Sequence, residues 1–144
     1  MPKPAAWRLD VETYPFAERV TTRFQDLDPH GHINNVAMAA IFENGRVRFN
    51  RNFVHHKVTG QRWLIAAVAI NYVEEAHFPA DIIVATGVGA LGQRSWSLLA
   101  AAFQNGSCVA TCDATLVISG AEHNREISPE LRSALEGLRL REPA

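Results

Sequence analysis

The sequence predicts an α+β domain in which one long helix is covered by a curved antiparallel sheet of about five strands. Two observations lead to this fold class. A segment rich in alanine and free of proline carries apolar residues at helical spacing. β-prone segments follow it and are separated only by short turn-forming pairs. Such short links join antiparallel neighbours, because a parallel pair needs a long crossover connection.

The composition is that of one ordinary globular domain. We expect residues 1–144 to form a single domain, because a chain of this length buries about two thirds of its unfolded surface. The 14 basic and 15 acidic residues nearly cancel, which argues against nucleic-acid or membrane binding through net charge. The N-terminal residues lack a hydrophobic signal segment, and the apolar run 63–70 is too short to span a bilayer. These features predict a cytoplasmic protein.

The first third of the chain leads into the long helix. Residues 1–15 are expected to be an irregular lead-in at the surface, and residues 20–25, which are β-branched and aromatic, a first strand. A turn-forming stretch follows, in which Pro29 fixes one φ angle and Gly31 frees another. The long helix is predicted over about residues 35–52. Its alanines indicate that other structure encloses it.

The remaining chain alternates strands and turns. Residues 63–74, 81–91, 95–104 and 108–119 are β-prone, and Asn105-Gly106 is the strongest hairpin signal. Ser128 and Pro129 would open a C-terminal helix as cap and first residue. The apolar stripe of that helix would consist of Leu131, Leu135 and Leu138.

An open sheet with one helix leaves an uncovered edge, and pairing two copies edge to edge would cover it. The sequence therefore predicts a homodimer or a homotetramer built from it. The two cysteines, Cys108 and Cys112, lie in an apolar β-prone segment, and we expect reduced thiols in the core rather than nucleophiles.

The segment from Asp26 to Asn35, followed by Glu43 and Arg46, resembles the signature of the 4-hydroxybenzoyl-CoA thioesterase-like family of hotdog-fold enzymes. That signature reads Asp-x-Asp, two residues, Gly-His-Val-Asn-Asn, then Glu-x-x-Arg along the helix. Only Ile33, in the valine position, departs from it. The resemblance extends over nearly the whole chain in element order. It implies a hotdog fold whose sheet continues across a dimer, and hydrolysis of an acyl thioester to free acid and CoA without a cofactor other than the CoA of the substrate.

By position, the resemblance assigns the catalytic role to Asp28. The chemistry agrees, because Asp28 lies in a turn before a helix N-terminus, where free N–H groups stabilise negative charge. Asp28 could attack the thioester or activate water, and we favour a general base. His32 would orient the thioester or Asp28, although a loop histidine bonded to the backbone explains it equally well.

Further residues complete the predicted site. Asn35 would offer its amide to the carbonyl, and Gly31, Asn34 and Glu43 are predicted to contact substrate. Capping of the helix is the ordinary role for Asn34 and Asn35. A second branch of hotdog thioesterases uses a glutamate on the helix, but an ion pair with Arg46 is the simpler expectation for Glu43.

Other polar residues have ordinary explanations. Asp26 is expected to hold the turn through local hydrogen bonds. No metal site is expected, because neither the histidines at 30 and 32 nor those at 55 and 56 have companion ligands at a known spacing. Basic residues at the end of the helix could contact CoA phosphates, but more often they complement the helix C-terminus. They are Arg46, Arg48, Arg51 and Lys57.

Three other functions stay open on the sequence alone. A hydratase or dehydratase acting on enoyl or 3-hydroxyacyl thioesters is one, although His77-Phe78-Pro79 follows the long helix instead of preceding it. A thioesterase for acyl-carrier proteins is another, because the same stretch resembles the plant-type enzymes. The third is a non-catalytic acyl-binding module, against which the intact Asp28 counts. Phe42, Trp63 and Tyr72 could line the acyl pocket or simply belong to the core.

Overall fold

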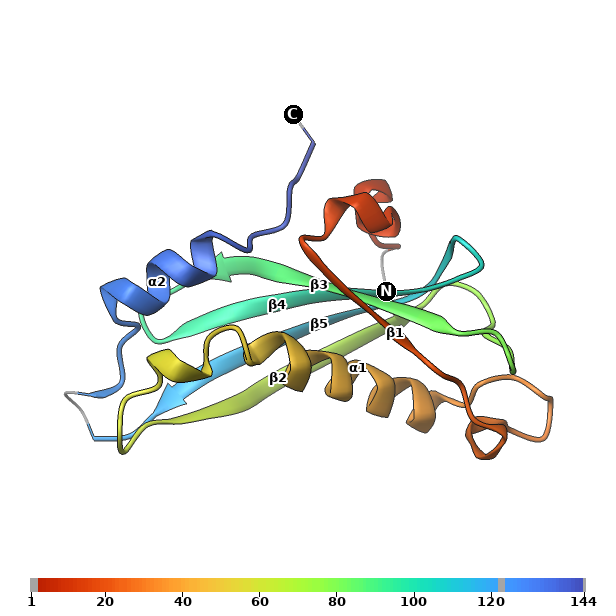
Figure 1. Ribbon diagram of the computed structural model, residues 1–144, viewed down its shortest axis with the longest axis horizontal. Coiled ribbons are helices and arrows are strands. Elements are labelled where there is room, and N and C mark those ends of the chain that lie inside the picture. Colours follow the sequence, from red (N-terminus) through yellow and green to blue (C-terminus); the bar gives the residue numbers. More distant parts are fainter. Residues whose placement is uncertain (1–2, 122–123, 144) are drawn as a thin grey trace.

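The computed structural model describes residues 3–121 and 124–143. Within them, the chain forms one five-stranded antiparallel sheet and a long helix that lies along one of its faces (Figure 1), which confirms the predicted fold class. The strands are β1 (Phe16–Val20), β2 (Arg62–Tyr72), β3 (Ile82–Leu91), β4 (Ser95–Gln104) and β5 (Ser107–Ser119). Their order across the sheet is β1-β3-β4-β5-β2. The α-helices are α1 (Asn35–Asn50) and α2 (Pro129–Glu136), and the short 3-10 helices are η1 (Ala6–Leu9), η2 (Val11–Thr13), η3 (Phe24–Asp26) and η4 (Val54–His56).

The predicted first strand at residues 20–25 is wrong. Strand β1 lies earlier, at Phe16–Val20, and the chain then turns through η3. The reason is local: the carboxylate of Asp26 accepts hydrogen bonds from the backbone N–H of Arg23 at 3.1 Å and from its guanidinium at 2.8 Å. These bonds close a tight turn where extended backbone was expected. Asp26 therefore has the structural role that the sequence indicated.

The other boundaries agree with the expected ones to within a few residues, and their caps form as predicted. The side chain of Asn34 accepts from the N–H of Ala37 at 2.7 Å, and Ser128 accepts from the N–H of Leu131 at 3.1 Å. Asn105 and Gly106 both have positive φ angles, 53° and 83°. This is the backbone that a two-residue hairpin between β4 and β5 requires.

Helix α1 packs against the inner face of the sheet, where most of the core lies. Buried residues from the helix meet residues of β3, β4 and β5 in one cluster, which includes Met38, Phe42, Val84, Ala102 and Cys112. The helix approaches β3 so closely that a Cβ atom on Gly45 would lie 2.7 Å from Cγ1 of Val84. A glycine is therefore required at this position for the helix and sheet to pack at their observed separation.

The outer face of the sheet is covered by the first residues of the chain, which corrects the expectation of an irregular lead-in at the surface. Residues 6–9 and 11–13 form η1 and η2, and Tyr14 packs edge-on against Phe103 with ring centroids 6.2 Å apart. Cys108 joins this outer cluster, while Cys112 belongs to the inner one. Both thiols are buried, as expected, and burial raises the pKa of Cys108 to about 11.

The two edges of the sheet differ in character. Strand β1 is short and carries Glu18, which pairs with Arg48 of α1 at 3.0 Å. Strand β2 has 11 residues, and no strand among the described residues pairs with its outer edge. Its apolar side chains are about half exposed, at 47% for Ile65 and 45% for Val68. In the described part of the chain, no helix is both long and apolar enough to cross a membrane.

Candidate active site

A cavity of about 310 Å³ opens where the turn after β1, the N-terminus of α1 and the end of β2 meet. It brings together residues that are far apart in the sequence. The lining residues are Asp28, His32, Ile33, Asn35, Met38, Tyr72, Val73, Glu74, Glu75 and Ala76. All three predicted catalytic residues, Asp28, His32 and Asn35, are therefore on its wall.

The turn that carries Asp28 is closed by its own backbone. The N–H of Asp28 donates to the carbonyl of His32 at 2.8 Å, and the N–H of Gly31 donates to the carbonyl of Asp28 at 3.0 Å. Gly31 has a φ of +81°, which a residue with a side chain rarely adopts. A further bond, from the N–H of Ile33 to the carbonyl of Ala76 at 2.8 Å, fixes the turn to the segment that follows β2.

One oxygen of the Asp28 carboxylate holds this turn, and the other is free of it. Oδ1 accepts from the backbone N–H groups of His30 at 2.9 Å and His32 at 3.1 Å. Oδ2 has no hydrogen bond to any residue in the described ranges. The N–H of His32, together with that of His30, lowers the pKa of Asp28 below its ordinary value, although desolvation acts in the opposite sense. Asp28 is thus an ionised carboxylate with one oxygen available to a ligand or water.

The N-terminus of α1 supplies backbone donors beside this carboxylate. The side chain of Asn34 caps the helix by accepting a hydrogen bond from the N–H of Ala37, and the backbone carbonyl of Asn34 accepts one from the N–H of Met38. The N–H groups of Asn35 and Val36 have no acceptor among residues 3–121 and 124–143. Free N–H groups in the first turn carry the positive end of the helix dipole. Since Asn35 lines the cavity, its N–H can stabilise an oxyanion that forms there.

The ring of His32 is held by a residue that the sequence analysis did not identify. Nε2 of His32 lies 3.1 Å from Oε2 of Glu75, and the ring packs edge-on against His77 at 5.2 Å between centroids. Glu75 also lines the cavity. The acidic pair Glu74-Glu75 just past an apolar strand was the available signal, but sequence does not show which loops face each other.

A second residue outside the expected set positions the wall of the cavity. Gln104, buried at the end of β4, accepts from the N–H of His77 at 2.9 Å and donates to the carbonyls of His77 at 2.7 Å and Ala80 at 3.0 Å. These three bonds clamp the segment after β2 that carries Glu75. The position of Glu75, and through it that of the His32 ring, depends on this clamp.

Three predicted substrate contacts do not line this cavity. Gly31 and Asn34 shape the turn and the helix cap instead. Glu43 lies roughly 12 Å further along the axis of α1, at a rise of about 1.5 Å per residue, and lines a different cavity. The expected ion pair between Glu43 and Arg46 is absent, because Arg46 turns beneath the helix towards Cys112 while Glu43 remains exposed. That prediction was wrong.

Comparisons with known proteins agree with this architecture. A family model for the thioesterase-like superfamily matches residues 22–135, while no curated protein matches the chain significantly. The PA5185 protein of Pseudomonas aeruginosa strain PAO1 is 25% identical with a TM-score of 0.79, over 94% of this chain and 99% of that one. A predicted thioesterase from Bacillus stearothermophilus is 24% identical, with a TM-score of 0.77 over 89% and 98% of the two chains.

A third solved structure is a thioesterase from Thermus thermophilus in complex with coenzyme A and zinc. It is 23% identical with a TM-score of 0.76, over 88% of this chain and 95% of that one. The family match includes the turn, α1 and every strand except β1. The chain belongs to the thioesterase-like superfamily and is a hotdog-fold thioester hydrolase.

Proposed function

We propose that this protein is a cytoplasmic acyl-CoA thioesterase in which Asp28 activates the attacking water. The observation that supports the proposal most directly is the position of Oδ2 of Asp28. It is an ionised oxygen without a partner in the described ranges, on a cavity that is also lined by Asn35, whose backbone N–H has no acceptor there either. Hydrolysis of a thioester needs both a group that activates water and donors that stabilise the oxyanion.

The proposed reaction uses these groups in sequence. Oδ2 of Asp28 takes a proton from water as the oxygen attacks the carbonyl carbon, and the oxyanion accepts a hydrogen bond from the backbone N–H of Asn35. Collapse of the tetrahedral intermediate breaks the C–S bond, and the CoA thiolate takes up the proton as it leaves. His32, held by Glu75, orients the carbonyl. Because a base of low pKa removes a proton weakly, the placement of the water and donors must provide most of the acceleration.

Turnover of an acyl-CoA panel tests this function. We expect release of free thiol from at least one class among short, long and aromatic acyl-CoAs, and slower release from the same acyl groups on an acyl-carrier protein. Consumption of a crotonyl thioester, followed by its absorbance, would instead identify a hydratase. Tight binding of acyl-CoA without any turnover would show a non-catalytic acyl-binding module.

We also propose that two copies pair through β2 into a homodimer. Strand β2 is long, apolar and unpaired on one side, whereas β1 is short and charged. An exposed apolar edge of this kind is a template for pairing with a second chain. Antiparallel pairing of β2 with its copy would extend the sheet to twice its width and cover the half-exposed side chains of Ile65 and Val68.

Substitution of Val68 by glutamate should convert the dimer to a monomer, because two-fold pairing would bring a new charge in each chain into an apolar interface. Sedimentation velocity measures the change. Val54→Glu is the matched control, because Val54 is similarly exposed, at 53%, but lies in η4 and is not part of β2. A dimer that survives Val68→Glu, or a wild-type monomer, would contradict pairing through β2.

A further inference from the structure

A second cavity, of about 230 Å³, lies between the C-terminal half of α1 and the first half of β2. Its walls include apolar side chains, Val47, Ile65 and Leu116, and four polar ones, Glu43, Arg46, Asn50 and Trp63. None of these polar residues belongs to the cavity that holds Asp28. The space is smaller than a site for a drug-sized ligand but large enough for a short or compact organic group.

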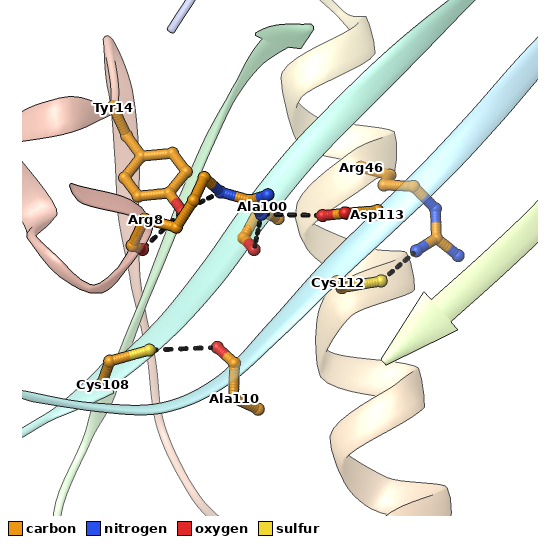
Figure 2. Close-up of polar contacts among 8 residues, drawn as sticks. All are labelled: Arg8, Tyr14, Arg46, Ala100, Cys108, Ala110, Cys112 and Asp113. Atoms are coloured by element: carbon orange, nitrogen blue, oxygen red, sulfur yellow. Dashed lines mark hydrogen bonds and ion pairs between the residues drawn. The ribbon is translucent and has the colours of Figure 1, made fainter. Parts of the chain in front are cut away.

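Arg46 is a buried cation that makes no ion pair with any carboxylate of the described residues. Only 7% of the residue is exposed, and its one hydrogen bond within the described ranges runs from Nη1 to Sγ of Cys112 at 3.5 Å (Figure 2). A thiol is a weak acceptor, and an arginine cannot lose its proton to escape the cost of burial. Among the described residues, no carboxylate oxygen lies within 4.0 Å of the guanidinium. A buried charge of this kind is costly unless an opposite charge meets it.

Two further polar atoms at this cavity also lack a hydrogen-bond partner within the described residues. Nε1 of Trp63, a pure donor, and Oδ1 of Asn50 are buried without a hydrogen-bond partner in the described part of the chain. Buried polar atoms are nearly always satisfied. The guanidinium of Arg46 lines this cavity, and the exposed carboxylate of Glu43 on the same cavity does not pair with it. A planar carboxylate fits the guanidinium, because it accepts two parallel bonds from such a group.

We infer that the Arg46 cavity recognises a carboxylate carried by the acyl group of the substrate. The inference rests on the proposed acyl-CoA hydrolysis and names its substrate class: monothioesters of dicarboxylic acids. In the proposed dimer, the Arg46 cavity of one chain comes to lie near the Asp28 cavity of the other. Helix α1 runs antiparallel to β2, because Met38 shares the first cavity with Tyr72 and Asn50 shares the second with Trp63. Antiparallel pairing of β2 with its copy places the Trp63 end of each strand beside the Tyr72 end of the other.

The Arg46 cavity of each chain then adjoins the Asp28 cavity of its copy. A thioester carbonyl at Asp28 would direct the far end of a short acyl group towards a guanidinium. A terminal carboxylate would satisfy Arg46, whereas a methyl group in its place would leave the cation unpaired. Hydrogen bonds to charged groups of this kind change affinity by about ten- to a hundredfold.

The test compares acyl-CoAs of equal chain length that differ only in the terminal group: glutaryl- against pentanoyl-CoA, and adipoyl- against hexanoyl-CoA. We expect kcat/KM of the wild type to favour the dicarboxylic member by at least about tenfold. Arg46→Met, which keeps the bulk of the side chain, should abolish or reverse that preference. Arg48→Met, two residues along the same helix but paired with Glu18 on the surface, should retain it.

Binding of free glutarate, measured as a shift in the unfolding midpoint, separates this inference from the proposed function. If no thioester is hydrolysed, the hydrolytic proposal fails, while a shift in the wild type that is absent in Arg46→Met still supports carboxylate recognition. Arg46→Met should also unfold at higher temperature than the wild type without ligand, because it removes an uncompensated buried charge. Loss of stability in that variant, or equal preference for the two thioester series in the wild type, would overturn the inference.

Discussion

Replacing Asp28 with asparagine should reduce kcat for thioester hydrolysis by about a hundred- to ten-thousandfold, the usual contribution of a positioned general base. The loss should occur without unfolding. Asparagine retains an oxygen that can accept the N–H groups of His30 and His32, so the turn keeps both of its bonds to residue 28. What disappears is the negative charge on the oxygen that faces the cavity. The measurement is steady-state release of free thiol, with far-ultraviolet circular dichroism as the check on folding.

Asp81→Asn is the control for this experiment, because Asp81 makes only a long ion pair with exposed Arg19, at 3.4 Å. Its kcat should stay within about twofold of the wild type. Full activity in Asp28→Asn would remove Asp28 from the mechanism. A comparable loss in Asp81→Asn would show that surface carboxylates in general affect the assay.

The pH profile provides an independent check on the same residue. Hydrogen bonds from His32 and His30 lower the pKa of Asp28 below its ordinary value of 3.8. The ionised form is therefore present at every pH above that value, and it is lost only as pH falls through the lowered pKa. We expect kcat to show no decline attributable to Asp28 between neutral pH and about pH 5. An acidic limb with a midpoint near pH 6 in the wild type would indicate that another group controls the proton transfer.

The fold could be predicted from the sequence to the extent that local chemistry specifies it. Asn34 as helix cap, the Asn105-Gly106 hairpin and Ser128 before Pro129 are each satisfied by atoms within a few residues, and all three form. The first strand was misplaced for a related reason. Residues 20–25 have strand-like composition, but the carboxylate of Asp26 competes for the backbone of Arg23 and closes a turn there. Composition alone does not show such a competition.

The site could be predicted only as far as the contiguous motif extends. Asp28, His32 and Asn35 share one turn and helix start, so their proximity follows from the chain itself. Glu75 reaches the site from the segment after β2, Gln104 holds that segment from the end of β4, and Arg46 contacts Cys112 of β5 across the core. These contacts depend on the direction in which each side chain projects from its helix, strand or loop. A helical spacing of three made Glu43 the expected partner of Arg46, but burial of the guanidinium beneath the helix overrode that local pairing.

Removing Arg8 should destabilise the protein by about 2–3 kcal/mol, somewhat less than the roughly 3–5 kcal/mol for breaking a fully buried ion pair. Arg8 fastens the lead-in to the outer face of the sheet (Figure 2). It donates from Nε to the hydroxyl of Tyr14 at 2.9 Å, and from Nη2 to the carbonyl of Ala100 at 3.2 Å and to Asp113 at 2.7 Å. Burial lowers the pKa of Arg8, but the bonds with Asp113 and Tyr14 outweigh it and leave the pKa raised.

The expected loss of stability depends on how deeply the side chains of Arg8 and Asp113 are buried. Arg8 is almost fully buried, whereas 48% of the Asp113 side chain is exposed, so water screens part of the charge interaction. Arg8→Ala also leaves the carbonyl of Ala100 without that donor. Arg19→Ala is the matched control: it breaks an ion pair at 3.4 Å whose arginine is 70% exposed, and should cost at most about 1 kcal/mol. Urea unfolding gives both values, and a double-mutant cycle with Asp113→Ala isolates the pair. Equal losses for Arg8→Ala and Arg19→Ala would mean that the apolar contacts of Tyr14 and Leu9, rather than the buried arginine, hold the lead-in on the sheet.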